Sequence, residues 1–133
     1  MIRLATEDDL YWLAERLYQL RFITAWAQHD MSEYTISNLV DFIVSKLDDP
    51  NSVIFIDGTS VCGASLGQFI YPPFYPHITE WMWTGEDKRA TARCLQAAFQ
   101  WGKEHGAVFG GYVLATPGKS PDWVDEQWVW RRL

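Results

Sequence analysis

Three strand-like segments that follow one another between helical patterns constrain the fold of this chain most strongly. Ser52–Ile56, Val61–Tyr71 and Phe74–Thr84 are rich in β-branched and aromatic residues, and Asp57–Ser60 has the composition of a tight hairpin turn. Strands connected this closely pair antiparallel with their neighbours. Such a sheet buries its apolar faces under helices, and helical patterns flank it in the sequence on both sides.

Apolar residues at helical spacing predict three helices. A capping box at Thr6–Asp9 begins the first, because its hydroxyl and carboxylate can satisfy free amides of the first turn. Ser32 is expected to cap the second, Pro50 follows its end, and Gly106 stops the third. The predicted helices extend from Leu10 toward Ala27, from Ser32 to Asp48, and over Glu86–His105.

Three further strands complete the predicted sheet. Ile2–Ala5 is a short first strand, and the alternating segment Glu126–Arg131 is the last. Val108–Ala115 is too apolar to be half-exposed, so we place it inside the sheet. The prediction is one α/β (α+β) domain over residues 1–133. It has a mixed, mostly antiparallel central sheet flanked by helices, in the order β-α-α-β-β-β-α-β-loop-β.

Charge and composition exclude several classes of protein. The chain of 133 residues has a formal net charge of −6, which repels phosphate backbones and makes nucleic acid an unlikely partner. Apolar runs are too short to span a membrane, and the acidic start differs from a secretory signal, so we expect a cytoplasmic protein. Cys62 and Cys94 lack metal-ligand spacing, so we expect reduced core thiols and no metal.

Three stretches of the sequence occur in a familiar order. They are Ile2–Leu10, the segment Thr79-Glu80-Trp81-Met82-Trp83-Thr84, and Lys88–Ala107. In that order they are similar to three parts of a known family of enzymes: the first strand-helix junction, the fourth strand, and the third helix with the start of the fifth strand. Together they resemble the GNAT superfamily of acyl-CoA-dependent N-acyltransferases over Ile2–Ala115, and short phage-encoded members are similarly economical.

The resemblance implies a binding site for acetyl-CoA, or another acyl-CoA, as co-substrate. In the family the strand before the long helix separates from its neighbour, so we expect a gap beside Trp81–Thr84. Free amides at the start of the following helix then bind the diphosphate. The residues that the resemblance assigns to this site are Met82, Trp83, Thr84, Lys88, Arg89, Ala90, Thr91 and Ala92.

The turn before the long helix departs from the family pattern Gln/Arg-x-x-Gly-x-Gly/Ala. Arg89 stands where a glycine is expected, and Glu86-Asp87 add negative charge, as acidic residues often do in a first helical turn. Two interpretations stay open. Either Lys88 and Arg89 contact the phosphates while Ala90–Ala92 supply backbone donors, or the loop no longer binds a nucleotide.

Acyl transfer to an amine requires a base, oxyanion donors and an acid. The resemblance implies Glu80 as the base and a backbone N–H near Met82 or Trp83 as the oxyanion donor; the alternative for Glu80 is a solvated carboxylate on an open strand. Tyr112 is the nearest tyrosine to the expected position of the acid, although it is also typical of a core aromatic. The ten residues Thr116–Asp125 are too few for the family's fourth helix and a further strand.

Acceptor and partner surfaces have weaker signals. His29, Asp30 and Glu33 are either an acidic pocket for an amine acceptor, small molecule or protein, or ordinary polar loop residues. A Trp-rich last strand predicts a homodimer, since an exposed edge of this kind needs cover. The rival hypothesis to an enzyme is a non-catalytic protein of this fold that acts as a protein-binding accessory or assembly factor. Aromatic residues that could line an acceptor site or a dimer contact are Tyr71, Phe74, Tyr75, Trp123, Trp128 and Trp130.

Overall fold

A computed structural model of the chain describes residues 1–23, 35–117 and 124–133. These residues form strands and helices in the predicted order. The elements are β1 (Arg3–Leu4), the 3-10 helix η1 (Glu7–Asp9), α1 (Leu10–Ile23), α2 (Ile36–Leu47), β2 (Ser52–Asp57), β3 (Ser60–Gln68), β4 (Pro76–Thr84), α3 (Lys88–Glu104), β5 (Phe109–Pro117) and β6 (Val124–Arg132).

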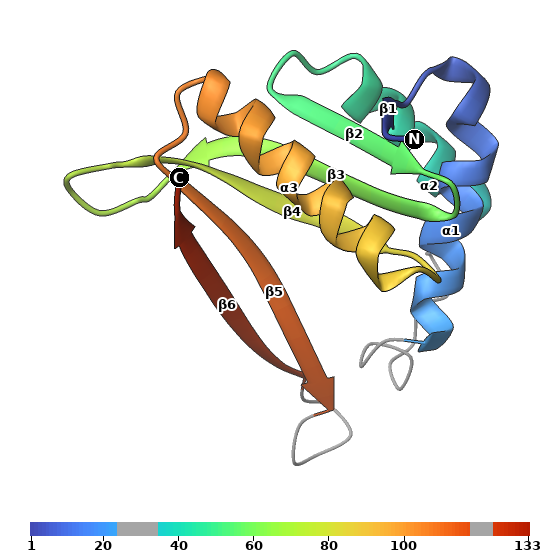
Figure 1. Cartoon of the computed structure of the whole chain (residues 1–133). Coiled ribbons are helices and arrows are strands. Elements are labelled where there is room, and N and C mark those ends of the chain that lie inside the picture. The colour runs from blue at the N-terminus through green and yellow to red at the C-terminus, as the bar shows by residue number, and fades with distance from the viewer. Residues whose placement is uncertain (24–34, 118–123) are drawn as a thin grey trace.

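The strands form one six-stranded sheet whose order follows the chain, β1-β2-β3-β4-β5-β6 (Figure 1). Neighbours run antiparallel except β4 and β5, which are parallel because α3 carries the chain back between them. This confirms the predicted fold class, a mixed and mostly antiparallel sheet flanked by helices.

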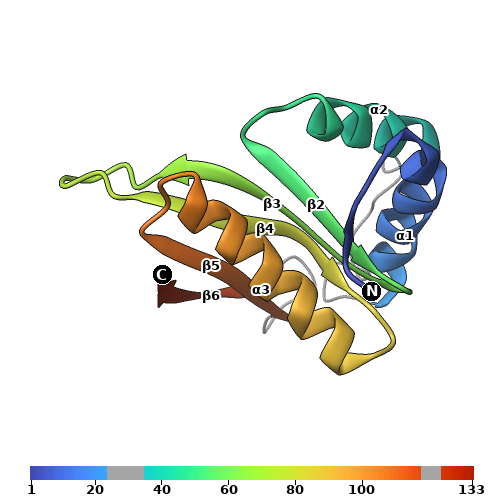
Figure 2. The same ribbon diagram turned by 45° about the horizontal axis from the view of Figure 1, so that its top comes forward.

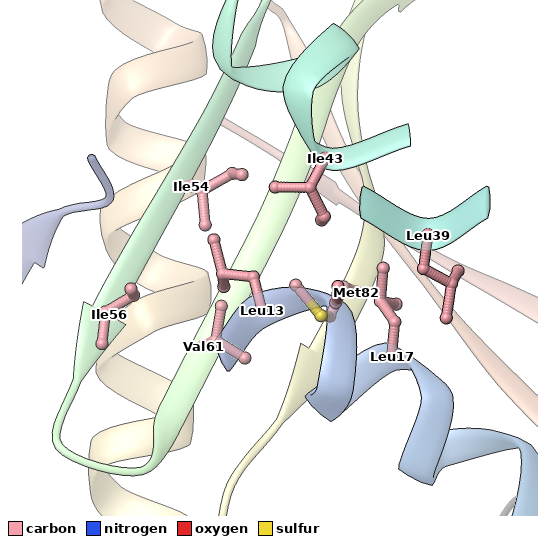
Figure 3. Packing of buried hydrophobic residues seen from close by; sticks show 9 residues of the cluster. Leu13, Leu17, Leu39, Ile43, Ile54, Ile56, Val61 and Met82 are labelled. Atoms are coloured by element: carbon pink, nitrogen blue, oxygen red, sulfur yellow. The ribbon is translucent and has the colours of Figure 1, made fainter. Parts of the chain in front are cut away.

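Helices pack on both faces of the sheet, α1 and α2 on one and α3 on the other (Figure 2). The alternation along β2 divides the core, because Ile54 and Ile56 join the first cluster and Val53 joins the second. Cys62 and Cys94 are free, fully buried thiols of the α3 cluster, as predicted. Figure 3 shows the cluster under α1 and α2, with Leu13, Leu17, Leu39, Ile43, Ile54, Ile56, Val61 and Met82.

Local signals set the starts of the first two helices. The capping box is present, since the Thr6 N–H donates to the Asp9 carboxylate at 2.9 Å. The Arg3 guanidinium also binds that carboxylate and, with Thr6, lowers the pKa of Asp9 to about 2. The N-cap of α2 is Thr35, whose hydroxyl accepts from the Asn38 N–H at 3.2 Å, and the predicted cap Ser32 lies outside the described residues. In the described ranges no helix is long and apolar enough to cross a lipid bilayer.

The predicted turn between β2 and β3 is confirmed, whereas the predicted lengths of β3 and β4 and the predicted burial of β5 need correction. Gly58 has φ +62° in the β2–β3 hairpin, a conformation that glycine adopts readily. β3 ends at Gln68 and β4 begins at Pro76, so both strands are shorter than predicted and leave an exposed loop between them. β5 does lie inside the sheet, but Leu114 is 49% exposed. Leu114 shares a face with Tyr112, which packs against the α3 cluster, so its exposure shows that α3 does not cover the part of β5 that has diverged from β4 (Figure 1).

Candidate functional site

β4 and β5 separate soon after they meet. Their parallel pairing comprises three pairs, His77 with Phe109, Ile78 with Gly110, and Thr79 with Gly111. Beyond Thr79 the two strands diverge (Figure 1), as expected beside Trp81–Thr84. The backbone edge of β4 beyond Thr79 thus lacks a β5 partner.

Two glycines let α3 lie tightly against the joined end of the two strands. A side chain on Gly102 of α3 would collide with Ile78, and one on Gly110 would collide with the ring of Phe99. The C-terminal part of α3 is therefore packed where β4 and β5 are paired. The N-terminus of α3 lies near the C-terminal end of β4, where β5 no longer pairs with β4 (Figure 1).

A β-bulge in β4 marks the start of the divergence. Glu80 pairs with Ala64 and Met82 pairs with Gly63, so Trp81 between them has no partner on β3. The extra residue shifts the alternation of side chains. Ile78 faces α3, whereas Met82 is 1% exposed in the α1–α2 cluster (Figure 3). Only the backbone of Met82 is therefore placed to contact a ligand in the gap.

Glu80 is a buried carboxylate at the point where the strands part. It is 9% exposed, and its Oε1 accepts a hydrogen bond from the Val113 N–H of β5 at 3.1 Å. Burial raises the pKa of Glu80; the Val113 N–H opposes this rise, and the charge of Glu126 adds to it. The carboxylate is thus held between the two strands and retains its proton to a higher pH than an ordinary glutamate.

Two aromatic side chains also meet across the divergence. The Trp83 indole N–H donates to the Thr91 carbonyl of α3 at 2.8 Å, which fixes the ring beneath the helix. The Tyr112 ring of β5 contacts it edge-on, with centroids 5.3 Å apart. Because Val113 follows Tyr112, the structure brings both candidate catalytic residues, Glu80 and Tyr112, to the same part of the gap. It also shows that Tyr112 packs against the α3 cluster.

The amides at the start of α3 are already bonded. Asp87 is the N-cap, and its Oδ1 accepts from the N–H of Arg89 at 2.9 Å and of Ala90 at 3.3 Å. The Asp87 carbonyl accepts from the Thr91 N–H at 2.9 Å and from the Thr91 hydroxyl at 2.8 Å. Ala92 lies within the regular helix, where its amide is directed at the Lys88 carbonyl. The expectation that these amides are free is therefore wrong, although the Lys88 and Arg89 side chains are exposed.

The capping role of Asp87 was not among the predictions from the sequence. Aspartate is among the preferred N-cap residues, and that preference was the available signal. The turn before it is also closed. Gly85 packs against Ser60 and Thr91, whose hydroxyls are 2.9 Å apart, so this glycine serves the chain's own packing. Thr84, the last residue of β4, pairs with Val61.

The histidines of the described residues do not join this site. His77 lies among the rings of Phe69 and Trp130, and burial lowers its pKa. His105 is the C-cap of α3, and its Nδ1 lies 2.7 Å from the Trp101 carbonyl. Within the described part of the chain, no group of three His, Cys, Asp or Glu side chains could hold a metal ion. His29, Asp30 and Glu33 lie outside the described residues.

Solved structures similar to this chain include acetyltransferases and a protein of another description. A ribosomal-protein-alanine N-acetyltransferase from Brucella melitensis has a TM-score of 0.68 at 14% identity, over 100% of this chain and 99% of that one. An acetyltransferase of the GNAT family from Streptococcus pneumoniae gives 0.55 at 14%, over 87% and 74%. A transcriptional regulator from Bacillus halodurans C-125 gives 0.57 at 15%, over 80% and 76%.

These comparisons establish the fold of the chain. No family model matches the sequence, and no curated protein matches it. The structural likeness, at 14–15% identity, therefore shows the GNAT fold, which confirms the resemblance at that level. The fold alone does not define an activity, since one fold supports several functions.

Proposed function

We propose that this chain is an acyl-CoA-dependent N-acyltransferase that transfers an acetyl or other acyl group to an amine. The observation that carries the proposal is the early end of the β4–β5 pairing at Thr79, with the buried carboxylate of Glu80 one residue beyond. An unpaired strand edge offers backbone groups to the pantetheine amides of a donor. The acidic chain favours an amine acceptor that carries positive charge.

In the proposed reaction Glu80 takes the proton of the acceptor amine, directly or through water. The amine nitrogen attacks the thioester carbonyl, and a backbone N–H near Met82 or Trp83 stabilises the oxyanion. The carbon–sulfur bond then breaks, and the thiolate takes a proton, for which Tyr112 is the candidate donor. The raised pKa of Glu80 suits this role, because a more basic carboxylate removes a proton more readily.

The pantetheine arm of acyl-CoA fits the site better than its diphosphate does. The pantetheine arm suits the unpaired edge at Met82–Thr84, and the exposed Lys88 and Arg89 side chains attract phosphate. The diphosphate does not fit the helix start as it stands, because the Asp87 carboxylate occupies two amides there. We therefore expect acyl-CoA to bind weakly.

The same contacts favour a second candidate, a non-catalytic protein of this fold that binds another protein. Asp87 closes the amides of α3, and the Glu80–Val113 and Trp83–Tyr112 contacts cross the divergence. A structure stabilised by such internal contacts does not require a ligand. Exposed aromatic residues of the β3–β4 loop, Tyr71, Phe74 and Tyr75, would then serve the partner.

Calorimetric titration with acetyl-CoA separates the two candidates. The enzyme gives saturable heat at high micromolar donor, and thiol release in the presence of an amine panel measures turnover. The matched variant Glu80→Gln keeps an acceptor for the Val113 N–H, so it should bind donor but release little thiol. Absence of heat from folded protein would reject the acyltransferase and leave the binding protein.

A further inference from the structure

β6 is a long strand at the edge of the sheet. It has nine residues, and within the part of the chain that the structure describes only β5 pairs with it. A long edge with a regular register is a template for pairing with another strand. The question is which strand fits.

The hydrogen bonds to β5 show which backbone groups are directed outward. Leu133 N–H donates to the Val108 carbonyl at 2.9 Å, in step with the register that pairs Arg132 with Phe109. In an antiparallel ladder, residues that bond to the neighbour alternate with residues that do not. Odd-numbered residues of β6 therefore bond to β5. The even-numbered residues direct their N–H and C=O groups to the free edge; these are Val124, Glu126, Trp128, Trp130 and Arg132.

The same even-numbered residues present an aromatic face opposite α3. The ring of Trp130 fills the space beside Gly111, while Gly110 faces Phe99 of α3. Trp128 and Trp130 stack with centroids 5.7 Å apart and remain 43% and 39% exposed. Arg132 is on this face too, because its guanidinium lies 6.0 Å from the Phe109 ring centroid.

We propose that two copies of this chain pair edge to edge through β6, antiparallel, with Val129 on the two-fold axis. This register sets Trp128 opposite Trp130 of the second copy, and Glu126 opposite its Arg132. Both pairs occur twice, and both use the residues whose backbone groups are directed outward. Aromatic and opposite-charge pairs are the cross-strand pairs that stabilise sheets. The strand is acidic at its start and basic at its end, so it complements itself only when antiparallel.

A shift of the axis by one residue loses this complementarity. With Trp128 on the axis, Glu126 faces Trp130, and Val124 faces Arg132. Neither of these is a favourable pair. The register about Val129 also keeps the α3 helices of both copies on one face of a continuous twelve-stranded sheet, as a two-fold axis normal to the sheet requires.

Cysteine cross-linking tests the register directly. Facing residues of a pair that exchanges no hydrogen bonds have Cα atoms about 4.5 Å apart, within the disulfide range of roughly 4.4–6.8 Å. Val129→Cys should therefore give a covalent dimer under mild oxidation. The control Gln127→Cys should not, because the thiols that it places on the two copies lie four residues out of step, at least about 13 Å apart. Cys62 and Cys94 are fully buried and should give little background.

Charge reversal tests the pairing in solution by sedimentation equilibrium of the full chain. Wild type should show twice the mass of one chain, and Glu126→Arg or Arg132→Glu should each raise the dimer Kd about tenfold or more. The double variant should restore the wild-type value. Arg131→Glu is the matched control, since Arg131 faces the neutral Gln127 of the second copy. Circular dichroism checks that each variant is folded.

A wild-type monomer at millimolar concentration, a dimer that Val129→Cys does not cross-link, or a double variant that fails to recover would each overturn the proposal. The outcome is independent of acyl-CoA binding, because no donor is present in these measurements.

Discussion

Replacement of Asp87 by alanine should weaken the start of α3 and strengthen the binding of acyl-CoA. The carboxylate accepts from two backbone amides, at 2.9 Å from Arg89 and 3.3 Å from Ala90. Loss of an N-cap of this kind costs ~1 kcal/mol of folding free energy. For a domain of this size that loss lowers Tm by roughly 2–6 °C.

The gain in binding comes from the same two amides. Each amide that finds an anionic partner contributes about 1 kcal/mol net, so two contribute about 2 kcal/mol. This corresponds to a Kd for CoA that is roughly 30-fold lower. Removal of the carboxylate also ends its repulsion of the diphosphate, which acts in the same direction.

Asp87→Asn separates the amides from the charge. Asparagine caps a helix about as well as aspartate, so Tm should stay near the wild-type value while the amides remain occupied. CoA affinity by calorimetry should therefore rank alanine above asparagine above wild type, whereas stability should rank wild type and asparagine above alanine. If Asp87→Ala loses stability but binds CoA no more tightly than wild type, the amides do not contact the donor and the reasoning is refuted.

Three further predictions concern catalysis and stability. Glu80→Gln should lower kcat at least about 100-fold, and the wild-type rate should rise with pH through a pKa above that of an ordinary glutamate; an unchanged rate in the variant would rule out Glu80 as the base. Ile43→Ala should destabilise the fold by about 2–5 kcal/mol in urea unfolding, because the Ile43 side chain of α2 is fully buried against the sheet, and a smaller loss would mean that the neighbouring side chains move in to fill the cavity. Asp9 has its pKa lowered to about 2, so its contribution to stability should be present above about pH 4 and be lost as the pH falls toward 2. Asp9→Asn should remove that pH dependence, and a wild-type profile that matches the variant would contradict the pairing with Arg3.

Local signals in the sequence predicted much of the fold. The capping box at Thr6 and the hairpin glycine Gly58 act within a few residues, so their effects could be inferred without knowledge of distant contacts. The exposed face of β5 could not be inferred, because it depends on how far β5 diverges from β4 and from the cover of α3. Leu114 is apolar yet half-exposed for that reason.

The divergence of β4 and β5 was predictable in position, whereas the detail of the candidate site was not. The divergence after Thr79 followed from the resemblance in element order. The bulge at Trp81 depends on the register of β3 against β4, which the sequence does not state residue by residue. Asp87 carried a recognisable capping preference, but whether it turns back onto the helix or toward solvent is decided by the turn before it.

Gly102 of α3 and Gly110 of β5 allow close packing at the C-terminal end of α3 only, where β4 and β5 are paired. The helix has seventeen residues and is about 25 Å long, so a small tilt at Gly102 is magnified at Asp87. A methyl group added at Gly102 or Gly110 would push the C-terminal end of α3 away from the sheet. The N-terminus of α3 would then move relative to the gap between β4 and β5. Substitutions at Gly102 and Gly110 would therefore change the width of the gap although both residues lie away from it.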